Sequence, residues 1–269
     1  MISFVGAGPG DPELITIAGA KRLAEADIVI WAESLIPRTL LNHCSDTVTT
    51  ISSASMTLED VTDLYIKNHE ANIVRLHSGD PSIYGALQEQ IDFCIDFGLN
   101  YEVIPGVTSL SATAACLGRE LTIPRVSQSV IITRLSGKTS DSMPSREKLE
   151  SFARIGGTIA VFLSASYPSE MQESLLCSGS AFTASTPVVI ATRATWPDQN
   201  FIHTDIGNLA STLKDSGFKR TVLVVVGDAL SGKAARSHLY RPDFAHKFRK
   251  RSLVGTTVGR QTKAKPNKL

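Results

Sequence analysis

The chain has 269 residues, of which 42% are hydrophobic and 20% are charged. This composition is typical of a globular protein with one large domain or two domains of ordinary size. No apolar run approaches the ~18 residues that a membrane-spanning helix needs, which argues against an integral membrane protein. The chain opens directly into a strand-like run rather than a secretory signal. We therefore expect a cytoplasmic protein without a membrane partner.

The net charge of +1 hides an uneven distribution. Eight basic and no acidic residues follow position 245, which leaves 19 basic against 26 acidic residues in the rest of the chain. The residues after Arg251 also lack aromatic side chains and periodicity, so residues 246–269 are expected to form a disordered tail. A nucleic-acid-binding arm is the alternative, but the acidic body argues against nucleic acid as the main partner.

The cysteines lie far apart in the sequence and form no C-x-x-C pair. This spacing favours reduced, buried thiols over a disulfide framework or a zinc site. The four residues are Cys44, Cys94, Cys116 and Cys177.

Strand-like and helical patterns alternate through the first part of the chain. Strands are predicted over residues 2–5, 27–31, 73–76 and 101–104. Helices are predicted over residues 12–26, 57–69, 82–97 and 109–117, with a helical turn over 37–43. Thr57, followed by Asp60, is suited to cap one of these helices. The alternation predicts a mostly parallel sheet covered by helices.

A second set of elements follows a connection over residues 118–125. Strands are predicted over residues 126–133, 158–163, 187–192, 200–204 and 221–227. Helices are predicted over residues 147–155, 169–176 and 206–214, and a polar loop over 137–146. We therefore expect two α/β domains, residues 1–118 and 119–245, before the basic tail.

The stretch Val5-Gly6-Ala7-Gly8-Pro9-Gly10-Asp11 ends the first predicted strand. Glycine lets the backbone turn sharply and approach a ligand closely. A dinucleotide fingerprint would need its third glycine at Asp11, and Pro9 removes a donor from the turn. NAD binding is therefore disfavoured, while a structural turn and a ligand loop both remain open.

Two further turns of this kind follow predicted strands. They read His77-Ser78-Gly79-Asp80-Pro81-Ser82-Ile83-Tyr84-Gly85 and Pro105-Gly106-Val107-Thr108-Ser109. In open α/β sheets, ligands bind beyond the carboxyl ends of the strands. Three such turns in one domain favour a ligand site there.

In order and spacing, GAGPGD, GDPSIYG and PGVTS resemble the motifs of the tetrapyrrole methyltransferases, which use S-adenosylmethionine. The resemblance covers about residues 1–249. Segments at 32–37, 76–81, 118–124, 192–198 and 238–244 are most similar to members that methylate carbon 11 of precorrin-4 in cobalamin biosynthesis. The resemblance implies that reaction on a precorrin-4-type substrate, a homodimer, and a cleft between two α/β domains for cofactor and substrate.

The resemblance also implies which residues contact S-adenosylmethionine and its product S-adenosylhomocysteine. In the first domain these are Pro9, Ser78, Gly79, Asp80, Ile83, Thr108 and Ser109. In the second domain they are Leu163 and Ala194. A helix N-cap is the alternative role of Asp80.

Precorrins carry many carboxylates, which arginine recognises well. The candidate substrate-binding residues are Arg38, Arg119, Arg134 and Arg193, with Tyr84 and Trp196 against the macrocycle. Each arginine could instead be a surface or ion-pair residue, and each aromatic ring could fill the core between the domains.

The catalytic residue is left open by the sequence. Some relatives that methylate uroporphyrinogen carry a proposed aspartate base in the segment matching residues 31–35, where this chain has Glu33. Glu33 is either its substitute or a solvated loop acid, and Arg119 and Arg193 are further candidates. A sulfonium methyl is already activated, so no metal is expected.

The alternative functions are a sibling methyltransferase for another precorrin carbon, a nucleotide or tetrapyrrole carrier, and, more weakly, an NAD oxidoreductase. Whether the substrate contains cobalt stays open.

Overall fold

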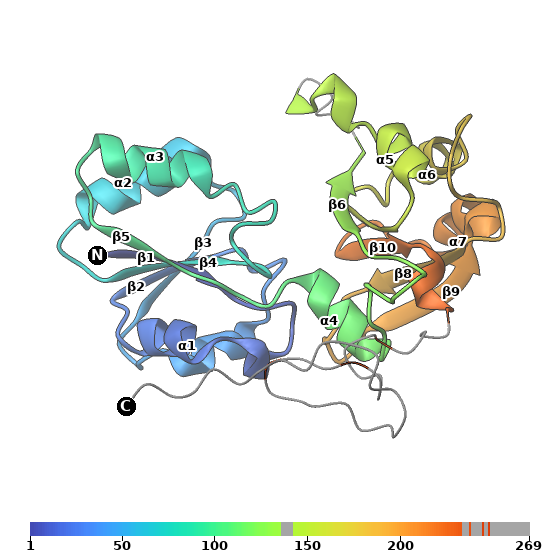
Figure 1. Ribbon diagram of the computed structural model, residues 1–269. Coiled ribbons are helices and arrows are strands. Elements are labelled where there is room, and N and C mark those ends of the chain that lie inside the picture. The colour runs from blue at the N-terminus through green and yellow to red at the C-terminus, as the bar shows by residue number, and fades with distance from the viewer. Residues whose placement is uncertain (136–141, 233–236, 238–243, 245–246, 248–269) are drawn as a thin grey trace, which may run out of the picture.

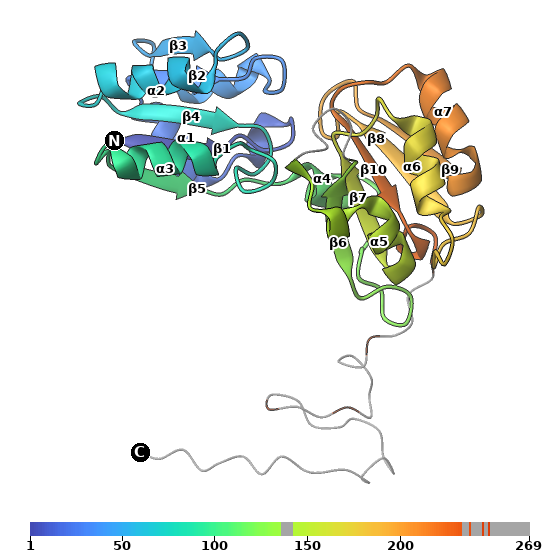
Figure 2. The same ribbon diagram turned by 90° about the horizontal axis from the view of Figure 1, so that it is seen from above.

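A computed structural model describes residues 1–135 and 142–232, together with 237, 244 and 247. These residues form two lobes, each built on a five-stranded sheet (Figure 1, and Figure 2 from above). The predicted tail, residues 246–269, lies outside the described residues except for Lys247, and so does most of the segment 238–244. Within the described part, no helix is long and apolar enough to cross a membrane.

The first lobe contains the predicted parallel sheet. Its strands are β1 (Ile2–Gly6), β2 (Ile28–Trp31), β3 (Thr49–Ser52), β4 (Ile73–His77) and β5 (Tyr101–Ile104). They lie in the order β3-β2-β4-β1-β5, and every neighbouring pair is parallel. The sequence analysis missed β3, because this edge strand is short, polar and only partly buried.

Helices cover both faces of this sheet (Figure 1). They are α1 (Ile17–Ala24) on one face and α2 (Leu58–Lys67) and α3 (Gln88–Asp96) on the other. Thr57 and Asp60 form the expected cap of α2, in which each side chain accepts a hydrogen bond from the other residue's backbone. The other two helices are shorter than predicted.

The predicted helix over 12–26 divides into a 3-10 turn, Pro12–Leu14, and α1. Thr16 Oγ1 accepts a hydrogen bond of 3.0 Å from Gly19 N and starts α1 there. The predicted helix over 82–97 begins only at Gln88, because Tyr84 and Ala86 have left-handed φ values of 54° and 48°. An α-helix cannot continue through such residues.

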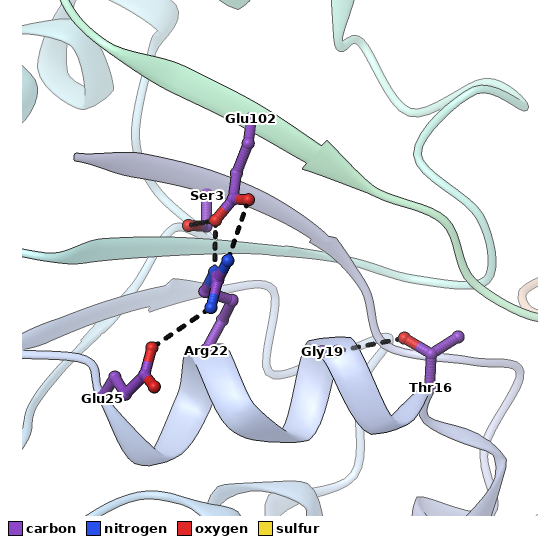
Figure 3. Close-up of polar contacts among 6 residues, drawn as sticks. All are labelled: Ser3, Thr16, Gly19, Arg22, Glu25 and Glu102. Atoms are coloured by element: carbon purple, nitrogen blue, oxygen red, sulfur yellow. Dashed lines mark hydrogen bonds and ion pairs between the residues drawn. The ribbon is translucent and has the colours of Figure 1, made fainter.

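An ion-pair cluster ties α1 to the sheet (Figure 3). Arg22 Nε and Nη2 donate to the carboxylate of Glu102 on β5, and Ser3 Oγ on β1 donates to the same carboxylate at 2.8 Å. The hydrogen bond from Arg22 lowers the pKa of Glu102 below its ordinary value. One helix and two neighbouring strands are thus held together at the end of the sheet remote from the glycine turns.

The second lobe contains a mixed sheet. Its strands are β6 (Val130–Arg134), β7 (Thr158–Phe162), β8 (Pro187–Thr192), β9 (Asn200–Asp205) and β10 (Val222–Val226). They lie in the order β6-β7-β10-β8-β9, and only β6 and β7 are parallel. The strand predicted over 126–133 begins at Val130, four residues later than expected.

Three helices pack on one face of the second sheet (Figure 1). They are α5 (Leu149–Ile155), α6 (Pro168–Leu175) and α7 (Leu209–Ser216). The helix predicted over 206–214 starts with a 3-10 turn, Ile206–Asn208, which Asp205 caps by accepting from Asn208 N. Residues 136–141 of the predicted polar loop lie outside the described residues.

The other face of the second sheet is covered by α4 (Ser109–Cys116), which follows the last strand of the first lobe. Leu110 of α4 is buried in one apolar cluster with Ala191 of β8 and Leu223 of β10. The domain boundary at residue 118 stays a prediction. The contacts of Leu110 place α4 against the second sheet.

Candidate active site

The three predicted glycine turns meet at one edge of the first sheet. Because β4, β1 and β5 are parallel neighbours, the turns that follow them lie side by side. Gly79 N donates to Gly8 O at 2.8 Å and Gly8 N donates to Gly79 O at 3.2 Å. A Cβ atom on Gly106 would overlap the Gly79 carbonyl oxygen, so this close approach requires glycine.

Asp80 ties two of these turns together. Its Oδ2 accepts a hydrogen bond of 2.8 Å from Gly106 N, and its Oδ1 accepts bonds from Ser82 N and Ser82 Oγ. Partial burial opposes ionisation of Asp80, but the hydrogen bonds from Ser82 and Gly106 outweigh it and lower the pKa of the carboxyl group. The alternative role as a helix N-cap is wrong, because α3 begins only at Gln88.

A cavity of about 360 Å³ lies between these turns and the second lobe. Its lining includes all of the residues expected to contact the cofactor, from both lobes. They are Pro9, Ser78, Gly79, Asp80, Ile83, Thr108, Ser109, Leu163 and Ala194. The fold therefore brings together residues up to 185 positions apart in the sequence.

The backbone of several lining residues is strained. Tyr84, Leu163, Arg193 and Thr221 have φ values of 54°, 53°, 49° and 51°, in the left-handed region that favours glycine. Side chains larger than glycine cost free energy there, and such residues persist where the surrounding structure holds them in place. Strained backbone is common at ligand-binding sites, which supports a functional role for this cavity.

The turn around Thr195 and Trp196 in the second lobe is hydrogen-bonded to the first glycine turn. Trp196 Nε1 donates to Pro9 O at 2.9 Å, and Asp11 N donates to Thr195 Oγ1 at 2.9 Å. The Trp196 ring also covers Gly10, where a Cβ atom would overlap it. The guanidinium carbon of Arg193 lies 3.9 Å from the centre of the Trp196 ring. Trp196 therefore joins the two lobes while lining the cavity.

The predicted substrate residues divide into two groups. Tyr84, Arg193 and Trp196 line the cavity. Arg193 is already engaged, because its Nε donates to Asp198 Oδ1 at 2.7 Å. The other candidates, Arg38, Arg119 and Arg134, do not line it, and neither does Glu33, although Leu35 does.

Arg119 and Arg134, which do not line the cavity, form hydrogen bonds with other residues of the second half of the chain. Arg119 Nη1 donates to Gly232 O at 3.3 Å. Arg134 Nη1 donates to Leu135 O at 3.1 Å, and its Nη2 donates to Ser142 Oγ at 2.7 Å.

The sequence analysis missed Lys219, Arg220 and Thr221, which also line the cavity. They precede β10, whereas the site was expected at the carboxyl ends of strands. Because β10 runs antiparallel to β7 and β8, its amino end lies beside their carboxyl ends. The basic pair Lys219-Arg220 before a strong strand was the available signal, but it could be placed only once the direction of β10 was known.

The chemistry available at the cavity is that of hydrogen bonds, charge and shape. Its polar lining consists mainly of hydroxyl groups and backbone groups at glycine turns, and Phe162, Val222 and Leu223 supply an apolar wall. Among the described residues, no three His, Cys, Asp or Glu side chains are grouped to hold a metal ion. All four cysteines lie within the described part and are free thiols, but the expectation that they are buried is correct only for Cys94.

Two α/β lobes with a cavity at their strand ends define a ligand-binding α/β protein. The sequence profile of the tetrapyrrole (corrin/porphyrin) methylases matches residues 1–210. The chain therefore belongs to the tetrapyrrole methylase family, as the glycine motifs predicted.

Curated relatives match nearly the whole chain. A cobalt-precorrin-4 C(11)-methyltransferase of Methanocaldococcus jannaschii is 44% identical and covers 93% of this chain and 96% of the relative. A precorrin-4 C(11)-methyltransferase of Pseudomonas aeruginosa is 38% identical and covers 92% of this chain and 98% of the relative.

Solved structures share the fold. A cobalt precorrin-4 methyltransferase of cobalamin biosynthesis superposes with a TM-score of 0.81 at 36% identity, covering 86% of this chain and 96% of that chain. A uroporphyrin-III C-methyltransferase from Thermus thermophilus, complexed with S-adenosyl homocysteine, gives a TM-score of 0.71 at 25% identity and covers 85% of this chain and 98% of that chain. The expected two-domain α/β architecture is confirmed.

Proposed function

We propose that the chain transfers a methyl group from S-adenosylmethionine to carbon 11 of precorrin-4, or of its cobalt complex, in cobalamin biosynthesis. The observation that carries the proposal is the convergence of all nine expected cofactor-contact residues on one cavity between the lobes. The names of the two relatives support the same reaction and include both forms of the substrate.

The chemistry of the cavity lining supports the cofactor assignment. Gly79 lines the cavity, and the turn that carries it approaches Gly106 so closely that a Cβ atom on Gly106 would overlap the Gly79 carbonyl oxygen. Hydroxyl groups of Ser78, Thr108 and Ser109 can bond the amino-acid and ribose portions, and Leu163 and Ala194 line the cavity from the second lobe, where the adenine side is expected. A related structure holds the demethylated form of the cofactor.

When bound, the cofactor supplies an already activated methyl group on a sulfonium ion. The residues of the chain then serve mainly for alignment and exclusion of water. Asp80 keeps the turns after β4 and β5 in register, and the Trp196 contact with Pro9 fixes the lobes across the cavity. Good alignment of two reactants can contribute on the order of 7 kcal/mol or more to a rate.

No side chain is yet assigned as the base that removes the proton from the methylated ring. Glu33 is exposed on the turn after β2, and Leu35, two residues later, lines the cavity. This position keeps Glu33 as the first carboxylate to test for a general base.

The direct test supplies the purified protein with carbon-13 methyl-labelled S-adenosylmethionine and, in parallel, precorrin-4 and cobalt-precorrin-4. We expect one labelled methyl group at carbon 11, located by NMR, and the faster of the two reactions identifies the natural substrate. A label on another ring carbon would favour the sibling methyltransferase. Binding of S-adenosylhomocysteine and tetrapyrrole without turnover would instead favour a carrier.

We also propose that the protein is cytoplasmic and that it is a homodimer, the assembly that the family resemblance implies. Light scattering on the eluate of a sizing column would measure twice the 28.9 kDa chain mass for a dimer. A mass of one chain at assay concentration would contradict it.

A further inference from the structure

Some of the charged side chains that line the cavity have hydrogen-bond or ion-pair partners among the described residues, and others do not. Of the described residues that line it, Asp80, Arg193, Lys219 and Arg220 carry charge. The Asp80 carboxylate accepts hydrogen bonds within the glycine turns, and Arg193 is paired with Asp198. The exposed side chains of Lys219 and Arg220 form no ion pair or hydrogen bond with any other described residue.

The backbone that carries these two cations is anchored on both sides. Gly217, with φ of 69° in the left-handed region, ends α7 two residues before Lys219. Thr221 O accepts a hydrogen bond of 3.0 Å from Arg193 N, and Val222 pairs with Thr192 on β8. The backbone is thus held in place on both sides of the pair, so a ligand that binds Lys219 and Arg220 has to order only their side chains.

The rest of the lining lacks a free charge for an anion. Apart from the Asp80 carboxylate, which would repel an anion, the turns after β1, β4 and β5 offer neutral hydroxyl and amide groups, and the wall formed by Phe162, Val222 and Leu223 is apolar. A ligand with several carboxylates therefore finds free positive charge, among the described lining residues, only at Lys219 and Arg220. Of the four arginines that the sequence suggested, only Arg193 belongs to this lining, and Arg38, Arg119 and Arg134 lie outside it.

We propose that Lys219 and Arg220 bind carboxylates of the tetrapyrrole substrate and so set the orientation of the macrocycle toward the methyl donor. This inference rests on the proposed function and names the residues that select the substrate. The two cations follow Gly217 on an exposed segment, so they can bind peripheral carboxylates while the macrocycle lies against the apolar wall.

The test uses Lys219→Ala, Arg220→Ala and the double variant in the full chain. Lys214→Ala is the matched control, because Lys214 is exposed on α7, outside the lining, and donates only to Ser169 Oγ among the described residues. Steady-state kinetics with precorrin-4 would give KM and kcat, and calorimetry would give the Kd of S-adenosylhomocysteine. Fluorescence titration with uroporphyrin III, a stable tetrapyrrole with many carboxylates, would measure macrocycle binding at low and high salt.

We expect each single variant to raise KM and the uroporphyrin Kd about tenfold, because each removes one charge-assisted hydrogen bond at an exposed position. The Kd of S-adenosylhomocysteine should not change. Lys219→Arg and Arg220→Lys should recover most of the affinity, and the double variant should lose the salt dependence of the wild type. Lys214→Ala should behave like the wild type in every assay.

Three results would overturn the inference: an equal loss of S-adenosylhomocysteine affinity in the variants, an unchanged KM, or a salt dependence that survives in the double variant. The first would assign the cations to the cofactor. Failure of the wild type to bind S-adenosylhomocysteine would instead contradict the proposed function, so the two failures are distinguishable.

Discussion

At the scale of single residues, His77 connects the core of the first lobe to the ligand turn that follows β4. Its side chain is 5% exposed, and its ring centre lies 6.0 Å from that of Phe4. Burial, with a smaller effect of the Arg75 charge, lowers the pKa of His77 to about 4, although a hydrogen bond with the Gly85 backbone opposes this. Within the described residues His77 Nε2 has no partner, so the ring is neutral near pH 7.

This burial predicts an acid-sensitive fold. The folded pKa of about 4 lies below the unfolded value of ~6.5, so protons bind the unfolded chain first as the pH falls below ~6.5. We expect the burial of His77 to lower the free energy of unfolding by on the order of 2 kcal/mol at pH 5 relative to pH 7. Urea unfolding of wild type and His77→Phe at both pH values measures the difference.

The matched control for this measurement is His203→Gln, on an exposed position of β9. Wild type and His203→Gln should lose similar stability between pH 7 and pH 5, and His77→Phe should lose less. If all three chains lose the same amount, another group governs the acid sensitivity.

At the scale of elements, the first glycine turn and the turn around Trp196 act as one unit. The Trp196 ring packs directly over Gly10, which has no side chain, and its Nε1 donates to Pro9 O. The two lobes are in contact through this ring. A methyl group at position 10 would displace the ring, and removal of the ring would leave room for that methyl group.

This geometry predicts a strongly non-additive pair. Gly10→Ala alone should displace Trp196 and weaken S-adenosylhomocysteine binding by about 1–3 kcal/mol, and Trp196→Ala alone should weaken it by a similar amount. The double variant should bind better than the sum of the two losses predicts, because the alanine methyl no longer meets the ring. Calorimetry on the four chains measures the coupling, and strict additivity would show that the two residues act separately.

The same elements show what the sequence can predict. Strands β1, β4 and β5 were predictable because buried apolar runs end at glycine or proline turns, and their parallel pairing brought the turns together. The late start of α3 could not be predicted, because Tyr84 and Ala86 adopt a left-handed backbone conformation that their residue types do not indicate. Lys219 and Arg220 were missed because only the pairing of β10 with β7 and β8 places them at the cavity.

At the scale of the whole molecule, α4 belongs in space to the lobe that follows it in sequence. It covers the face of the second sheet that carries Ala160, Val189 and Leu223, and its own Leu110 is 7% exposed. Loss of a buried leucine side chain alone costs about 2–5 kcal/mol. Loss of the whole helix would expose the sheet face beneath it.

Fragments of the chain can test this assignment. A fragment of residues 109–232 should unfold cooperatively and remain in solution, whereas a fragment of residues 119–232 should be less stable and expose the apolar sheet face. Thermal unfolding and binding of a hydrophobic dye compare the two. Equal stability of the fragments would show that α4 adds nothing to the second lobe and would favour the boundary expected at residue 118.

The position of α4 also fixes an order of events during synthesis. The first sheet is complete once β5 has left the ribosome, but β10, which carries part of the surface for Leu110, ends at Val226, 110 residues after Cys116. At typical rates of translation this interval lasts on the order of 10 s. For that time the apolar residues of α4 lack the part of their packing surface that β10 supplies, so the second lobe closes over this helix only late in synthesis.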